Sequence, residues 1–220
     1  MRHYTTLSII LLIASLTYSC ANPAANKPKA SVSNAAPENS SKPAGGEVLT
    51  ISPDNSKVDF VAAKVTRSHN GSFQRFTGTI NLVNNSAESS RVSIDIETNS
   101  VVTDEPDLTK HLQTPDFFDV AKFPKASFVS TKIEPGSSDL GAQSYTITGN
   151  FDLHGVKKSI SFPATIQITP DNVSVTAEFA INRKDFGIVF QNKADDLIRD
   201  GVVIKLAVRV PRKTSQRLPD

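Results

Sequence analysis

The chain has 220 residues, with 24 basic against 22 acidic side chains and a formal net charge of +2. This near balance argues against a nucleic-acid-binding protein, which usually carries a basic stripe or a basic domain. The length is enough for one folded domain with tails.

The first residues have the layout of a secretory signal peptide. Arg2 supplies the positive start, the apolar run Ile9–Ile13 forms the centre, and small or hydroxyl residues follow. The apolar run is too short to be a convincing transmembrane helix. We therefore expect residues 1–19 to direct export, which leads to the periplasmic side of a bacterial membrane or to secretion.

The single cysteine, Cys20, ends this segment in the sequence LTYSC, which resembles the acylation site of bacterial lipoproteins. A lone cysteine in an exported chain cannot form an internal disulfide, and a free exposed thiol is reactive. Acylation would consume the thiol and anchor the protein in a membrane, with about 0.8 kcal/mol for each buried methylene. We therefore expect a lipoprotein, with an ordinary cleaved signal peptide as the alternative. Ala21 in the next position would imply the outer membrane by the enterobacterial sorting rule.

Residues 21–46 consist mainly of Ala, Asn, Pro, Ser and Lys and have no apolar period. Such a composition buries too little apolar surface to offset the entropy of ordering the chain. We interpret residues 20–46 as a lipidated cysteine with a flexible spacer. The folded domain is expected over residues 47–212, with a polar tail at residues 213–220.

From Val48 onwards, apolar and polar residues alternate in a series of runs. The runs lie at residues 58–62, 80–82, 92–96, 145–153, 160–168, 173–181 and 202–210. This period of two predicts antiparallel strands with one dry face and one wet face. The chain has no tryptophan and no cysteine pair that could pin two sheets together as in an immunoglobulin core. A barrel of about eight strands is therefore favoured over a sandwich.

The apolar face of these runs mixes large residues with small ones. The small ones are Ala62, Gly149, Ala164 and Ala177. Small side chains that face inward leave space, and a closed sheet of about eight strands can hold one small ligand. The pattern is consistent with a cavity inside the barrel.

The segment Asp104–Val120 interrupts the alternation. Leu108, Leu112, Phe117 and Phe118 fall at roughly helical spacing there, which predicts one or two short helical segments. Thr114 followed by Pro115 has the pattern of a helix N-cap.

The same segment contains His111 between lysine and leucine, and Asp116 and Asp119 on either side of two phenylalanines. An enzyme could use His111 or His154 with a nearby carboxylate as acid and base. The simpler interpretation is that these residues cap turns and helices. The four histidines, at positions 3, 69, 111 and 154, lack the spacing of metal ligands, so no metal site or cofactor is expected.

Several long motifs resemble those of the YceI-like family of lipid-binding barrels. They are SKVDFVAAKV, GSFQRFTGTINL, HLQTPDFFDVAKFPKASF, YTITGNFDLHGVKKSISFPATI and INRKDFGI, and the resemblance covers about Leu49–Val210. The resemblance implies an all-β, extended lipocalin-like antiparallel β-barrel with an apolar tunnel. It also implies binding of polyisoprenoids or other long-chain amphiphiles, the absence of catalysis, and homodimers as partners.

The phenylalanines are the candidate ligand-binding residues. Strand positions of the apolar face hold Phe60, Phe128, Phe151, Phe162 and Phe179, and the other segments hold Phe117, Phe118 and Phe186. Most should fill the core, and the sharper hypothesis is that they line a lipid cavity or form its lid. The remaining alternative is a solid barrel that serves as a structural or interaction module of the cell envelope. A cavity smaller than the few hundred Å³ typical of ligand sites would favour it.

Overall fold

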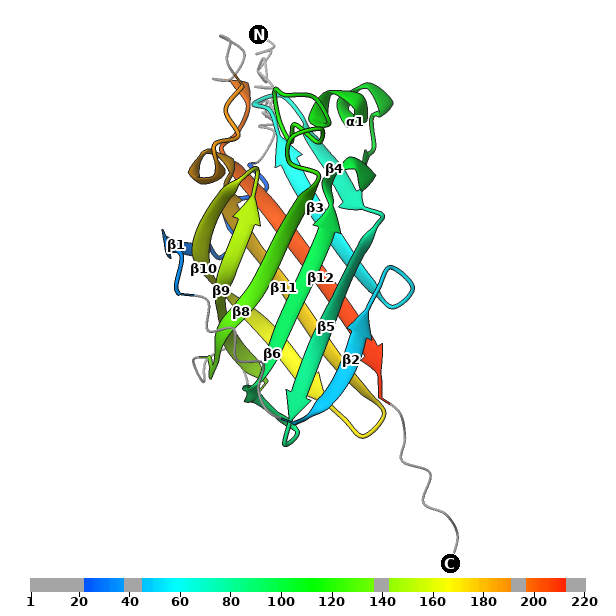
Figure 1. Ribbon diagram of the computed structural model, residues 1–220. Helices are drawn as coiled ribbons and strands as arrows, with labels where there is room; N and C mark the ends of the chain where they lie inside the picture. The colour runs from blue at the N-terminus through cyan, green and yellow to red at the C-terminus, as the bar shows by residue number, and fades with distance from the viewer. Residues whose placement is uncertain (1–21, 38–44, 137–142, 191–196, 213–220) are drawn as a thin grey trace, which may run out of the picture.

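The computed structural model describes residues 22–37, 45–136, 143–190 and 197–212. Most of them form a single strongly curled antiparallel sheet that wraps around a long axis (Figure 1). The strands are β1 (Ser31–Asn34), β2 (Glu47–Ile51), β3 (Ser56–Ala63), β4 (Ser68–Phe73), β5 (Phe76–Val83), β6 (Ser86–Glu97), β7 (Val101–Thr103), β8 (Lys125–Pro135), β9 (Ser144–Leu153), β10 (Val156–Ile168), β11 (Asn172–Asn182) and β12 (Gly201–Pro211). The predicted all-β barrel fold is confirmed.

The sheet has more strands than the sequence predicted. The described residues form twelve strands, in the hydrogen-bonded order β2-β5-β6-β8-β9-β10-β11-β12-β3-β4-β7, with β1 paired to β10 beside this path. The prediction of about eight was therefore wrong. β7 has only three residues, and β4 has a single large apolar side chain, so neither strand displays a period of two in the sequence.

Alternation explains which side chains enter the barrel. On the β11–β12 ladder, Phe179 lies opposite Ile204 and Val175 opposite Val208, and all four face the interior. Directly opposed apolar pairs of this kind stabilise an antiparallel sheet. The intervening Thr176 is exposed on the outer face.

The helical elements are few and short. Those bounded within the described residues are α1 (Pro106–Leu112), η1 (Thr98–Ser100) and η3 (Arg183–Phe186). Helix α1 confirms the expected helical segment and lies at one end of the barrel, opposite the end where β12 stops (Figure 1). It begins after Glu105 rather than after Thr114. Thr114 instead closes the following turn, where its hydroxyl donates to the carbonyl oxygen of His111.

The two ends of the predicted domain meet at the end of the barrel away from α1. The Arg212 Nε donates to Glu47 Oε2 over 2.8 Å, which links the residue after β12 to the first residue of β2. The same guanidinium donates to the carbonyl of Thr169 and to the Asn85 side chain, each over 2.8 Å. One arginine thus ties three connections together there.

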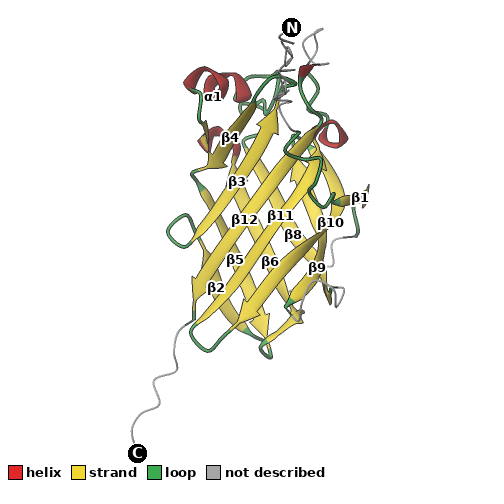
Figure 2. Ribbon diagram, turned by 180° about the vertical axis from the view of Figure 1, so that it is seen from behind, coloured by secondary structure: helices red, strands yellow, loops and turns green. Residues whose placement is uncertain are grey.

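Residues 22–37, which we call the strap, lie along the outside of the sheet and differ in this from the flexible spacer expected. Residues 31–34 pair with residues 158–161 of β10 (Figure 2). The Ala30 N–H donates to the carbonyl of Ala180 on β11 over 2.9 Å, and the Ala180 N–H donates to the carbonyl of Pro28 over 2.8 Å. Backbone hydrogen bonds hold this segment in place. The amino-acid composition of a segment does not reveal such bonds, because every residue type except proline can form them in full.

Side chains fix the strap at three further points. Ala24 is buried against Val61, Ala180 and Val203 on the outer face of the sheet. The Asn150 side chain clamps Ala36, accepting from its N–H and donating to its carbonyl over 2.9 Å each. Lys27 donates to Glu178 over 2.9 Å, and this hydrogen bond is the main reason that the pKa of Glu178 lies below its ordinary value.

Some parts of the expected domain organisation lie outside the described residues. These are the signal segment at residues 1–19, Cys20, residues 38–44 of the spacer, and the tail at residues 213–220. Export, acylation and anchoring therefore remain predictions.

The clamp on Ala36 gives a testable prediction. Asn150→Ala removes two neutral hydrogen bonds, each contributing about 1 kcal/mol, so amide hydrogen exchange in residues 30–36 should accelerate about tenfold or more. Hydrogen exchange followed by mass spectrometry measures this. Asn70→Ala, at an exposed position on β4, is the matched control and should leave the strap unchanged. Unaltered strap protection in Asn150→Ala would show that the clamp does not hold it.

Candidate functional site

A cavity of about 200 Å³ lies inside the barrel. Thirty-one residues line it, and among these described residues only Ser56, Arg183 and Arg199 are polar. On β12 its lining runs from Val202 to Val208, which is about 20 Å at roughly 3.3 Å per residue. The cavity is therefore long, narrow and apolar.

The volume lies below the range of roughly 300–1,000 Å³ usual for ligand pockets. The rings inside the barrel are the reason. Phe162 and Phe179 stack with centroids 4.1 Å apart and planes inclined by 12°, and Phe128 lies 5.7 Å from Phe162. Much of the interior is therefore filled by aromatic side chains, and the remaining space follows the barrel axis.

Two glycines make room for the rings that line the cavity. A Cβ on Gly71 would overlap the Phe60 ring, and one on Gly149 would lie 2.5 Å from Cζ of Phe128. Gly149 was expected to leave space for a ligand, whereas the structure gives that space to Phe128. The small residues that line the cavity are Ala62 and Ala126.

Seven of the eight predicted phenylalanines line the cavity. They are Phe60, Phe117, Phe118, Phe128, Phe151, Phe162 and Phe179. Phe186 is outside the lining: it is the last residue of η3 and fully buried, and its ring centroid lies 5.2 Å from that of Phe151 in an edge-on arrangement. Whether any of these residues binds a ligand stays a prediction.

Sequence reasoning missed Phe73, which also lines the cavity. Its ring centroid lies 5.7 Å from that of Phe60 and 5.7 Å from that of Phe118. It joins the strand rings to those of the segment after α1. The GSFQRF motif was the available signal, but Phe73 is the only large apolar residue of β4, so alternation could not assign it to the inner face.

His111 and His154, the candidate catalytic residues, lie outside the cavity lining. The Nε2 of His111 is 2.9 Å from Oδ2 of Asp116, so a histidine–carboxylate pair exists, but it is on the surface, with the two side chains 40% and 49% exposed. The imidazole packs edge-on against Phe117 and Phe190. His154 occupies a turn with φ of 55°, and its ring centroid lies 4.6 Å from that of Phe123.

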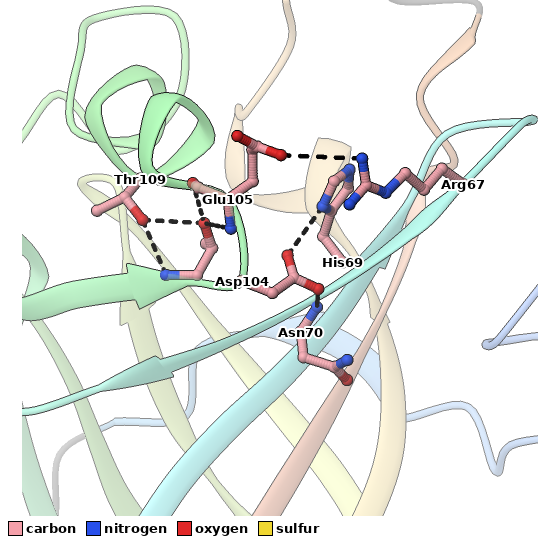
Figure 3. Close-up of polar contacts among 7 residues, drawn as sticks. Arg67, His69, Asn70, Asp104, Glu105 and Thr109 are labelled. Carbon is pink, nitrogen blue, oxygen red and sulfur yellow. Dashed lines mark hydrogen bonds and ion pairs between the residues drawn. The ribbon is translucent and has the colours of Figure 1, made fainter.

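Polar contacts with β4 hold the start of α1 (Figure 3). His69 Nδ1 lies 2.9 Å from Oδ1 of Asp104, and the Asn70 N–H donates to the other carboxylate oxygen over 3.0 Å. The Asn70 N–H, and to a lesser extent His69, keep the pKa of Asp104 below its ordinary value. Arg67 and Glu105 form a longer ion pair of 3.8 Å. These contacts position the segment that brings Leu112 and Phe117 to the cavity.

Within the described ranges, no group of three or more His, Cys, Asp or Glu side chains is arranged to hold a metal ion. In the same part of the chain, no helix is long and apolar enough to cross a membrane.

Comparison with known proteins identifies relatives of the whole folded region. A family model described as a YceI-like domain matches residues 49–210. Protein YceI of Salmonella arizonae is 35% identical over 124 residues, which are 54% of this chain and 62% of that protein. A UPF0312 protein of Pseudomonas putida is 32% identical with the same coverage. The match spans less than two thirds of the length of these relatives.

Solved structures share the fold. BcnA of Burkholderia cenocepacia has a TM-score of 0.65 at 21% identity, covering 72% of this chain and 98% of that one. A Campylobacter jejuni YCEI protein has a TM-score of 0.57 at 25% identity, covering 65% and 84%. A Saccharophagus degradans domain, described as polyisoprenoid-binding and implicated in plant cell wall breakdown, has a TM-score of 0.57 at 16% identity, covering 76% and 100%.

The carboxylate of Asp104 gives a prediction with a pH dependence. Its lowered pKa means that its stabilisation is present above about pH 5 and is lost as the pH falls through the lowered value. Asp104→Ala at neutral pH should accelerate amide exchange in α1 about tenfold. The unmodified protein should approach this behaviour as the pH is lowered below the ordinary pKa of an aspartate, after correction for intrinsic exchange. Asp54→Ala, an exposed carboxylate on the β2–β3 turn, is the control. If amide exchange in α1 changes neither with Asp104→Ala nor at low pH, Asp104 does not hold the start of this helix.

Proposed function

The chain belongs to the YceI-like family, and on this basis we propose that it binds a long-chain lipid of the polyisoprenoid or acyl type inside its barrel, without catalysis. The observation that carries the proposal is the long cavity whose lining is apolar along its length. An isoprenoid chain has no hydrogen-bonding groups, so it requires an enclosure of this kind. Each Å² of apolar surface removed from water contributes about 25 cal/mol to binding.

The similar fold of the Saccharophagus degradans domain, described as polyisoprenoid-binding, supports the same ligand class by analogy. The lining phenylalanines, with Phe73 added, are the proposed contacts of the chain. Acylation at Cys20 after export would hold the barrel at the periplasmic side of a bacterial membrane, where such lipids reside. Carrier, storage and sensing roles, and a homodimer, are all compatible with a barrel of this kind.

The second candidate is a solid barrel that acts as a structural or interaction module. The cavity volume of about 200 Å³ favours it, because this is below the usual range for ligand pockets. The shape of the cavity argues for the lipid instead, because a hydrocarbon chain requires a long cavity rather than a wide one. Catalysis by His111 with Asp116 is the weakest candidate, because this exposed pair lies apart from the cavity lining.

Lipid extraction and mass spectrometry of protein purified from its own host test the proposal. We expect a long-chain lipid to be recovered from the native protein. Ala126→Leu fills part of the cavity and displaces about two to three methylenes, which should weaken binding about tenfold or more. Ala207→Leu makes the same change on the outer face of β12 and is the matched control.

Two outcomes separate the candidates. Loss of lipid from Ala126→Leu alone supports binding in the cavity. Repeated recovery of a folded native barrel without lipid overturns lipid binding and leaves the solid barrel. Equal lipid content in Ala126→Leu and Ala207→Leu overturns binding in the cavity.

A further inference from the structure

The wall of the barrel is split between β10 and β11. These strands pair with each other only at residues 165–168 and 173–176. On their other sides, β10 pairs with β9 over ten positions and β11 pairs with β12 over eleven. Towards the α1 end, therefore, the two strands separate although each is fully paired to its other neighbour.

The strap closes this split. It pairs with β10 through Ser31–Asn34 and with Ala180 of β11 through Pro28 and Ala30. Ala30 and Val32 pack against the main hydrophobic core. The strap therefore forms part of the barrel wall between the two strands, as Figure 2 shows for β1 beside β10.

The strap is held differently from the strands that it joins. Its apolar contacts with the barrel come from small side chains, chiefly Ala24, Ala30 and Val32, and three of the four residues of β1 are exposed. Backbone hydrogen bonds, the Asn150 clamp and the Lys27–Glu178 pair supply the remaining contacts. A segment held in this way opens more readily than a core strand.

Behind the strap lie residues of the cavity. Ile160 and Phe162 of β10 and Phe179 and Ile181 of β11 all belong to its lining. The stacked rings of Phe162 and Phe179 connect the two strands across the split. Removing the strap would leave these rings as the layer between the cavity and the outside.

We propose that the strap is a gate, and that a long-chain lipid enters and leaves the cavity sideways between β10 and β11. This rests on the proposed lipid binding. The end of the barrel near α1 is covered by Leu112 and Phe117, and the opposite end is tied by Arg212. A lateral slot lets a chain slide in along its length, so that little of it is exposed to water during transfer. The edges of the end strands β2 and β7, which are not paired with each other, are the competing route.

A reversible cross-link tests the gate. Ser33 and Ser159 lie directly opposite each other in the β1–β10 ladder, and Ser33→Cys with Ser159→Cys, in a Cys20→Ser background, allows a disulfide between strap and barrel. The control pair is Thr148→Cys with Ser161→Cys, which joins β10 to β9 at residues whose hydroxyls are 2.7 Å apart. The readout is the rate at which cis-parinaric acid, a fluorescent long-chain fatty acid, passes from the protein to phosphatidylcholine vesicles.

Oxidation of the strap pair should slow transfer by about tenfold or more, because the strap can then leave only by breaking a covalent bond. Reduction should restore the rate, the equilibrium affinity should change little, and the control pair should show no redox dependence. Asn150→Ala, which loosens the strap without a cross-link, should speed transfer several-fold.

The outcomes distinguish the gate from the binding on which it rests. Equal transfer rates in the oxidised and reduced strap pair, with the probe bound, overturn the gate and leave lipid binding intact. The ligand would then use the β2–β7 side or the α1 end. Absence of probe binding in every form, including the native protein, overturns lipid binding and the gate with it.

Discussion

Backbone hydrogen bonding around the curled sheet is the constraint on which the rest of the structure depends. A strand edge that faces neither water nor a partner leaves unsatisfied N–H and C=O groups. Where β10 and β11 separate, their facing edges need a third strand, and residues 28–34 supply it. A segment with little apolar character is thereby ordered, because it satisfies edges that the barrel itself leaves open.

The size and shape of the cavity depend on how much of the barrel interior the aromatic rings fill. Strands deliver six phenylalanines to the cavity lining and the segment after α1 delivers Phe117 and Phe118. Glycines at positions 71 and 149 allow the rings of Phe60 and Phe128 to lie close to the neighbouring backbone. The result is neither a solid core nor a wide pocket. As the proposed lipid site, a narrow apolar cavity of this kind would favour chains over bulky ligands by shape, and hydrocarbon over polar groups by the cost of desolvation.

The segment from His111 to Phe118, which includes the end of α1, suggests catalysis by its sequence and covers one end of the cavity in the structure. His111, Asp116 and the neighbouring phenylalanines resemble part of an active site, and His111 does pair with Asp116. Yet the imidazole packs against the Phe117 ring, which in turn lines the cavity. The polar pair thus lies on the solvent side of an apolar cover, whose position is set by the Asp104 contacts with β4.

The sequence by itself determined the all-β class and the short helix, because alternation and its interruption are visible in the residues. It also pointed to seven phenylalanines that line the cavity, five of them through alternation and two, Phe117 and Phe118, through the break in it. Only the tertiary structure decided the number of strands, the exclusion of Phe186 from the lining, the inclusion of Phe73, and the ordering of the strap. These features depend on which backbone edges meet and on how rings share a limited volume, and both are set by contacts between residues far apart in the chain. Asn150 and Ala36 are an example: neither residue type signals the clamp until β9 and the strap are side by side.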